Sequence, residues 1–172
     1  MWSGDASGAS QPLQESLFEC WTTTAALARD TSRVRIGQMV TNNVFRHPAL
    51  LAKMASTVDV MSHGWLTLGI GSGSPLLAAQ FRAYYGSDFP PTSIRSGQLR
   101  EAVQILLRMW TQEEATFEGK YYQVNGAINQ PKGVQQPHIP LLIAGGGEQV
   151  TLKLVAQYGA ACSLYGDPQT AL

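Results

Sequence analysis

The chain has 172 residues, of which 44% are hydrophobic and 14% charged, a composition typical of globular proteins. Its 12 basic and 12 acidic residues cancel, which argues against nucleic acid or an anionic membrane as a partner and favours small molecules. No apolar run is long enough to span a membrane.

The two cysteines and the N-terminal segment are typical of a cytoplasmic protein. Cys20 and Cys162 lack CxxC spacing and lie in apolar contexts, so we expect buried free thiols in a reducing cytoplasm. Residues 1–14 are polar and rich in Gly and Ser, without the features of a signal peptide. We expect them to be irregular and residues 1–172 to form a single domain.

Helices and strands alternate in the first half of the chain. Apolar residues recur at helical spacing over residues 14–30, and the alternation in residues 33–40 predicts a strand. Pro48, which suits the first turn of a helix, begins a second helix that Gly64 ends. Residues 65–70 predict a buried strand, which is followed directly by Gly71, Ser72 and Gly73.

The middle of the chain is less regular. Residues 76–94 contain several aromatic residues and prolines and predict a long irregular segment, which is usually functional or an insertion. Residues 95–110 carry apolar side chains on one helical face. Two β-prone runs within residues 114–124 flank a glycine and predict a hairpin, and residues 131–140 predict an extended connection.

A strand, a glycine turn, a helix and a second strand follow. Residues 140–144 are a short apolar run bounded by Pro and Gly, which predicts a buried strand. After Gly145, Gly146 and Gly147, a pattern of helical period begins at Val150 and closes at Gly159. A second apolar run, residues 160–164, predicts another strand, which ends at Tyr165 and Gly166. Free N–H groups at such a helix start can hold a phosphate, although a tight turn without a ligand explains the glycines equally well.

The order of elements predicts an α/β fold with a parallel sheet, because helical crossovers join parallel strands. The four strands do not close a barrel, and a (β/α)8 barrel typically needs about 250 residues. The sheet is therefore either small and open or part of a barrel. In both architectures, ligands collect beyond the carboxyl ends of the strands.

The residues predicted at these strand ends are mostly uncharged. Such a rim can bind a ring system and a phosphate through main-chain groups, but it offers no acid, base or nucleophile, so the catalytic residues are unknown. The three histidines lack metal-ligand spacing, and no metal is expected; His47 is the histidine most worth testing. The cofactor-binding candidates are Met39, Val40, Thr41, Asn42, Gly71, Ser72, Gly73, Ala144, Gly145, Gly146 and Gly147.

The sequence resembles the luciferase-like flavin and deazaflavin oxidoreductases, in particular the branch that depends on coenzyme F-420 (also written F420). The resemblance covers roughly residues 15–167 in the family's order and spacing. It rests on the stretches ECWTTTAALARDTSRVRIGQMVT, FRHPALLAKMASTVDVMSHG, LTLGIGSG, LREAVQILLRMWTQEEATFEGKYY and INQPKGVQQPHIPLLIAGGGEQVTLKLVAQYG.

The resemblance implies a (β/α)8 TIM barrel in which the predicted strands are strands 3 to 6. Two strands would then precede Met1 and two would follow Leu172, so the chain looks like an internal fragment of a barrel of about 300 residues. The resemblance also implies a homodimer, with the helices around Trp21 and Leu51 at its interface.

The resemblance assigns roles to the candidate residues. A non-prolyl cis peptide bond between Met39 and Val40 would lie behind the deazaflavin ring, with Thr41 and Asn42 beside it. Gly71, Ser72 and Gly73 would line the polar chain of the cofactor. The turn from Ala144 to Gly147 would hold its phosphate.

Several residues depart from the family pattern. Trp65 stands where relatives carry Arg, and the residues from Ser74 to Ala79 lack the Trp and carboxylates that usually follow GxG. In relatives, an Asp-His pair at the end of barrel strand 2 forms part of the deazaflavin pocket, and we expect no counterpart of this pair in the present sequence. The resemblance implies hydride transfer between coenzyme F-420 and a small organic substrate. There are two alternatives. The first is an FMN-dependent monooxygenase of the same fold, and the second is a protein without catalytic activity, either a truncated fragment or a protein that only dimerises.

Overall fold

The structure is a computed structural model that describes residues 2–3, 5 and 18–164. Its main sheet has the strand order β1 (Trp2–Ser3), β2 (Ile36–Gln38), β4 (Leu66–Gly71), β7 (Leu141–Ala144) and β8 (Ala161–Ser163), and β3 (Thr41–Asn42) also pairs with β4. Every one of these pairings is parallel. The α/β class with a parallel sheet is thus confirmed.

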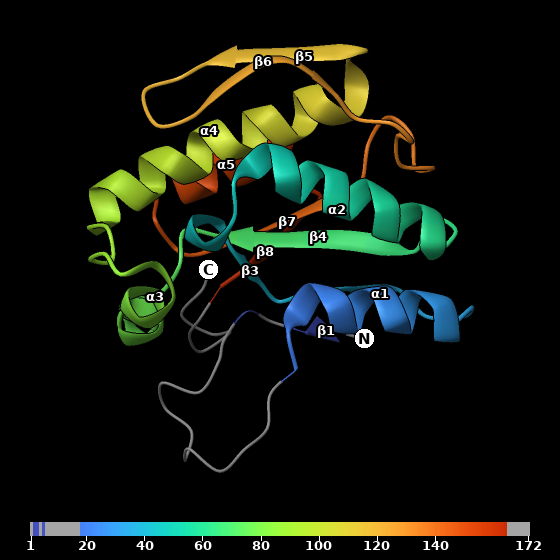
Figure 1. Cartoon of the computed structure of the whole chain (residues 1–172), viewed down its shortest axis with the longest axis horizontal. Helices are drawn as coiled ribbons and strands as arrows, with labels where there is room; N and C mark the ends of the chain where they lie inside the picture. The colour runs from blue at the N-terminus through green and yellow to red at the C-terminus, as the bar shows by residue number, and fades with distance from the viewer. Residues whose placement is uncertain (1, 4, 6–17, 165–172) are drawn as a thin grey trace.

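Four helices cover one face of this sheet. They are α1 (Cys20–Asp30), α2 (Pro48–Met61), α4 (Thr92–Thr111) and α5 (Thr151–Tyr158). Helices α2 and α4 lie side by side over β4, and the antiparallel hairpin of β5 (Glu114–Glu118) and β6 (Gln123–Ile128) lies beyond α4 (Figure 1). No helix among the described residues combines the length and apolar content needed to cross a membrane.

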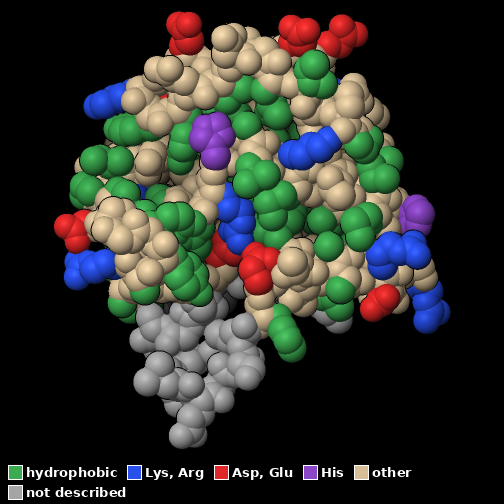
Figure 2. Space-filling view, viewed as in Figure 1, with side chains coloured by type: hydrophobic (Ala, Val, Ile, Leu, Met, Phe, Trp, Pro, Cys, Tyr) green, Lys and Arg blue, Asp and Glu red, His purple; other side chains and the backbone are tan. Residues whose placement is uncertain are grey.

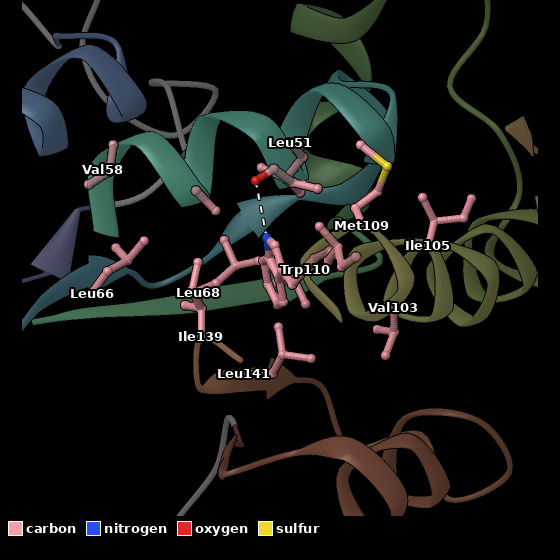
Figure 3. Close-up of a cluster of buried hydrophobic side chains, with 14 of the residues drawn as sticks. Leu51, Val58, Leu66, Leu68, Val103, Ile105, Met109, Trp110, Ile139 and Leu141 are labelled. Carbon is pink, nitrogen blue, oxygen red and sulfur yellow. Dashed lines mark hydrogen bonds between the residues drawn. The ribbon is translucent and has the colours of Figure 1, made fainter. Parts of the chain in front are cut away.

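The core lies between the sheet and the helices. Side chains alternate along a strand, so every second residue of β4 faces the helices, and Leu66, Leu68 and Ile70 are fully buried. Figure 3 shows the leucines of β4 and β7 meeting Leu51 of α2 and Trp110 of α4. The indole Nε1 of Trp110 donates to the carbonyl of Ala52 at 3.1 Å, which joins α4 to α2.

The structure corrects two predicted boundaries near the first strand. The segment over residues 33–40 is not one strand: β2 ends at Gln38, the peptide bond between Met39 and Val40 is cis, and β3 follows at Thr41. Helix α1 begins at Cys20, with the carboxylate of Glu19 accepting from the N–H groups of the first turn. The earlier part of the predicted helix, residues 14–17, lies outside the described residues.

Two segments predicted to be irregular contain regular structure. Residues 76–94 include most of the 3-10 helix η2 (Pro75–Leu77) and all of α3 (Ala78–Tyr85), whose buried Phe81 stacks on Phe45 with ring centres 6.0 Å apart. With one buried apolar residue, α3 shows no periodic pattern in the sequence from which a helix could be predicted. Near the N-terminus, Trp2 and Ser3 form β1, so one strand that was expected to precede Met1 lies on this chain.

The two cysteines differ in exposure. Cys20 is buried, as expected, but Cys162 is an exposed free thiol, which contradicts the prediction. In the register of the sheet Cys162 pairs with Ile143, so its side chain lies on the helix-covered face of the sheet. Leu164, two residues on, is exposed as well.

Candidate cofactor site

The carboxyl ends of the central strands bring three of the predicted groups together. The register places Asn42 beside Gly71, Gly71 beside Ala144, and Ala144 beside Ser163. Residues that are distant in sequence therefore form one continuous rim. The predicted rim of this last strand, Tyr165 and Gly166, lies outside the described residues, and the register places Ser163 beside Ala144 instead.

The expected cis peptide bond between Met39 and Val40 is present in the structure. Val40 packs over β4, where a Cβ on Gly71 would lie 3.1 Å from its Cγ2. A Cβ on Gly69 would lie only 1.8 Å from the carbonyl oxygen of Gln38. The glycines of β4 are therefore required by the close approach of the segment that contains the cis bond.

Met39 shows that the sheet curves around the rim. The hydroxyl of Ser163 on β8 donates to the Sδ of Met39 at 3.6 Å, although β4 and β7 lie between β8 and β2. In a flat sheet, three strand spacings would separate these main chains by about 14 Å. The contact requires a concave sheet, as in part of a barrel, with Met39 and Ser163 on the concave face.

Asn42 and Thr41 occupy different sides of their short strand. The hydroxyl of Thr41 accepts from the Nε1 of Trp21 at 3.0 Å, so its side chain faces α1 and leaves its main chain at the rim. The Oδ1 of Asn42 accepts from the N–H of Val44, whereas its buried Nδ2 has no acceptor among the described residues. Asn42 therefore retains an unused donor next to Gly73.

Asp5 is a rim residue that the sequence reasoning missed. It follows β1, and its Oδ2 accepts from the N–H of Asn42 at 2.9 Å, while its own N–H donates to the carbonyl of Val40 at 3.4 Å. Asp5 thus supplies a carboxylate at the end of the strand beside β2, which corrects the expectation of no counterpart there. Ala6 follows it, so the histidine of the pair is absent. The Gly- and Ser-rich surroundings hid this carboxylate.

An ion-pair cluster fixes Asp5. The guanidinium of Arg46 contacts Asp5 at 2.6 Å and Glu19 at 2.6 Å. Burial alone would lower the pKa of Arg46, but its hydrogen bond and charge interaction with Asp5 outweigh this effect and raise it. The pKa of Glu19 is lowered, because main-chain N–H groups of α1 and the charge of Arg46 overcome the effect of its burial. Arg46 thus joins the end of β1 to the start of α1 through two carboxylates.

The glycine turn after β7 is open. Gly145, with φ of 124°, donates its N–H to the carbonyl of Ser163 at 2.9 Å. A Cβ on Gly146 would meet only Leu164, at 4.0 Å, and the N–H groups of Gly146 and Gly147 have no acceptor in the described part of the chain. Helix α5 begins at Thr151, one residue after the predicted start at Val150, and the Oγ1 of Thr151 borders the turn beside Gly147. Thr151 is a second rim residue that was missed.

His47 begins α2 rather than facing the rim strands. Its Nδ1 accepts from the N–H of Ala49 at 3.3 Å, and its ring meets Tyr122 edge to face with centres 5.4 Å apart. Burial lowers the pKa of His47 and raises that of Tyr122. His47, the histidine singled out for testing, is therefore the N-cap of α2. Figure 2 shows charged side chains around the outline of this face and also a group of basic and acidic side chains near its centre, with hydrophobic side chains around them.

Comparison with known proteins defines the class. The sequence model of the luciferase-like monooxygenase family matches residues 1–170, so the chain belongs to this family. It is 37% identical over 135 residues to an F420-dependent glucose-6-phosphate dehydrogenase of Intrasporangium calvum, a match that covers 78% of this chain and 38% of that protein. It is 32% identical over 155 residues to the uncharacterised protein Rv0953c of Mycobacterium tuberculosis, covering 90% of this chain and 52% of the relative.

Solved structures share the fold. An F420-dependent secondary alcohol dehydrogenase in complex with an F420–acetone adduct superposes with a TM-score of 0.83 at 24% identity, over 98% of this chain and 50% of that one. The monooxygenase RslO1 from Streptomyces bottropensis superposes with a TM-score of 0.72 at 26% identity, over 83% of this chain and 41% of that one. The chain spans about half or less of these proteins, and its fold is part of a (β/α)8 barrel.

Proposed function

We propose that the protein carrying this chain is an oxidoreductase that transfers a hydride between coenzyme F-420 and a small organic substrate. The observation that carries this proposal is the rim of unused donors at the strand ends: the buried Nδ2 of Asn42 and the N–H groups of Gly146 and Gly147 have no acceptor among the described residues. The relatives at 34–37% identity named as F420-dependent dehydrogenases support the choice of cofactor.

The residues present fit a deazaflavin with a phosphorylated chain. The exposed Met39 and the neighbouring Val40 offer an apolar support for a ring, and the unused Nδ2 of Asn42 offers a donor beside it. The open turn at Gly146 and Gly147, with the start of α5, offers N–H groups to a phosphate. We assign the chain-lining role to Gly71, Ser72 and Gly73.

The bound deazaflavin would supply the hydride chemistry, while these residues would bind and orient it. Ser163 holds Met39 through its hydroxyl, and Asp5 holds the main chain of Asn42, so both act on the support for the ring. The acid or base of the reaction stays unassigned. The cytoplasmic location, the homodimer and the single-domain organisation also stay predictions; Trp21 and Leu51 themselves are buried in this chain's own core.

The second candidate is an FMN-dependent monooxygenase, and the fold shared with the monooxygenase RslO1 favours it. A riboflavin lyase that was solved with modified FMN also shares the fold, with a TM-score of 0.81 at 16% identity. Fluorescence titration with F-420 and with FMN separates the two candidates. We expect stoichiometric binding of F-420 and its reduction by a substrate. Tight binding of FMN with none of F-420 would favour the monooxygenase.

A third candidate, a protein without catalysis, stays a prediction. The same titration tests it, because a silent protein would bind neither cofactor. Cooperative thermal unfolding together with stoichiometric cofactor binding would exclude a silent fragment.

A further inference from the structure

Arg95 is a buried cation that donates to three main-chain carbonyls and one side-chain hydroxyl. It lies in the first turn of α4 and is 4% exposed. Its Nε donates to the carbonyl of Ser72 at 3.0 Å, and its Nη2 donates to the carbonyl of Gly73 at 3.4 Å and to the hydroxyl of Thr92. Its Nη1 donates to the carbonyl of Pro90, and the guanidinium lies 4.4 Å from the ring centre of Phe89.

No carboxylate pairs with Arg95 within the described residues; the ion pairs found there involve Arg46 and Arg82. A salt bridge therefore does not explain why this guanidinium is buried. Two of its acceptors belong to the loop that follows β4. Its most direct structural effect is to turn the carbonyl groups of Ser72 and Gly73 toward α4.

This orientation decides where the neighbouring N–H groups point. In a trans peptide the C=O and the following N–H point in opposite directions, and neither of these two bonds is cis. The N–H groups of Gly73 and Ser74 therefore point away from Arg95. Neither has an acceptor among residues 18–164.

A third unused donor lies at the same loop. The Oδ1 and Nδ2 of Asn42 would lie 2.5 Å and 2.9 Å from a Cβ on Gly73, so the amide of Asn42 covers this glycine. Asn42 is 2% exposed, and its Nδ2 is unpartnered in the described part of the chain. Buried donors are normally paired, so this one indicates an acceptor that a ligand would bring.

We propose that Arg95 is a positioning residue for the cofactor chain. By holding the carbonyls of Ser72 and Gly73, it presents the N–H groups of Gly73 and Ser74 to oxygen atoms of the anionic chain of the deazaflavin. Arg95 is buried and committed to other acceptors, so it acts through this loop rather than by touching the ligand. This inference rests on the proposed function.

The test compares two ligands that differ only in the chain. One is F-420, and the other is its 8-hydroxy-5-deazariboflavin core, which ends before the phosphate. For Arg95→Met in the full-length protein, we expect F-420 to bind about tenfold more weakly, while the core binds nearly as well as to wild type. For Arg95→Lys we expect an intermediate loss, because an ammonium lacks the planar fork that reaches several acceptors.

Arg108→Met is the matched control. Arg108 lies on the same helix, donates to the main-chain carbonyl of Thr116 at 2.8 Å and lies over the ring of Phe117, but it serves the outer hairpin. We expect its ratio of F-420 to core affinity to equal that of wild type. Thermal unfolding of each variant shows how much stability was lost.

Three outcomes would overturn the proposal. The first is an equal loss of affinity for both ligands in Arg95→Met, which indicates a general structural role. The second is an unchanged affinity for F-420 in both Arg95 variants. The third is a loss in Arg108→Met that matches the loss in Arg95→Met. A wild-type protein that binds neither ligand would instead overturn the proposed function, and this inference with it.

Discussion

Single charged side chains around the rim hold main-chain segments in place. Asp5 accepts from the N–H of Asn42, and Arg95 donates to the carbonyl groups of Ser72 and Gly73. Charge-assisted hydrogen bonds to the main chain are stronger than neutral ones. The shape of the rim therefore depends on charged residues that need not touch a ligand.

His47 gives a pH-dependent prediction at this scale. Burial lowers its pKa in the folded protein below the usual 6.5, and only the neutral ring can accept the N–H of Ala49. The folded state thus binds this proton more weakly than the unfolded state, so its contribution to stability is present above pH 6.5 and is lost as the pH falls below it. We expect His47→Asn, which caps at every pH, to remove this loss, which solvent screening at the exposed His47 keeps below about 1 kcal/mol.

Urea unfolding at about pH 7.5 and about pH 5 measures this effect. His63→Asn is the control, because His63 lies just past the other end of the same helix and its φ of 55° is one that Asn tolerates. We expect the control to keep the acid sensitivity of wild type. Equal sensitivity in His47→Asn and wild type would contradict the cap assignment.

The sequence predicted the residues of the rim better than their contacts. The cis bond at Met39–Val40 was predicted through the family resemblance, and Asn42, Gly71 and Ala144 through the rule of strand ends. The side chain of Thr41 faces α1, and Asp5 reaches Asn42 across 37 residues. Local patterns carry no signal for hydrogen bonds between segments so far apart in the chain.

At the scale of elements, long periodic segments were predicted well and short ones were not. Helix α4 shows an apolar face over several turns, so its position was predicted within a few residues. Helix α3 has eight residues and one buried side chain, Phe81, and was missed. Its stability comes from aromatic contacts with Phe45 and Phe89, which belong to other segments.

The packing of α4 on α2 is tested by Trp110→Phe. The change removes the hydrogen bond from the indole Nε1 to the carbonyl of Ala52 and leaves a small void in the core. We expect the free energy of unfolding to fall by about 1–3 kcal/mol, measured by urea denaturation.

Trp65→Phe is the matched control for this change, since Trp65 is 40% exposed and lies outside the α2–α4 contact. We expect it to change stability by less than about 0.5 kcal/mol. Equal effects of the two changes would show that Trp110 does not join the helices as described.

At the scale of the whole molecule, the concave sheet determines how the polypeptide behaves alone. Within the described residues, β8 pairs on one side only, with β7, and Ala161, Cys162 and Leu164 are exposed around it. Unpaired strand edges with exposed apolar residues promote self-association. We expect the 172-residue polypeptide, made by itself, to form aggregates detectable by light scattering, and a monodisperse monomer would contradict this.

The difference in exposure between Cys20 and Cys162 has a practical use. These are the only two cysteines in the sequence, and a buried thiol reacts slowly with reagents in solution. A maleimide dye would therefore attach to Cys162 in the unmodified polypeptide. Cys162 precedes Ser163, whose carbonyl accepts from the N–H of Gly145, so a dye there would lie next to the glycine turn. The chain thus carries a natural attachment point for a spectroscopic reporter beside its candidate phosphate site.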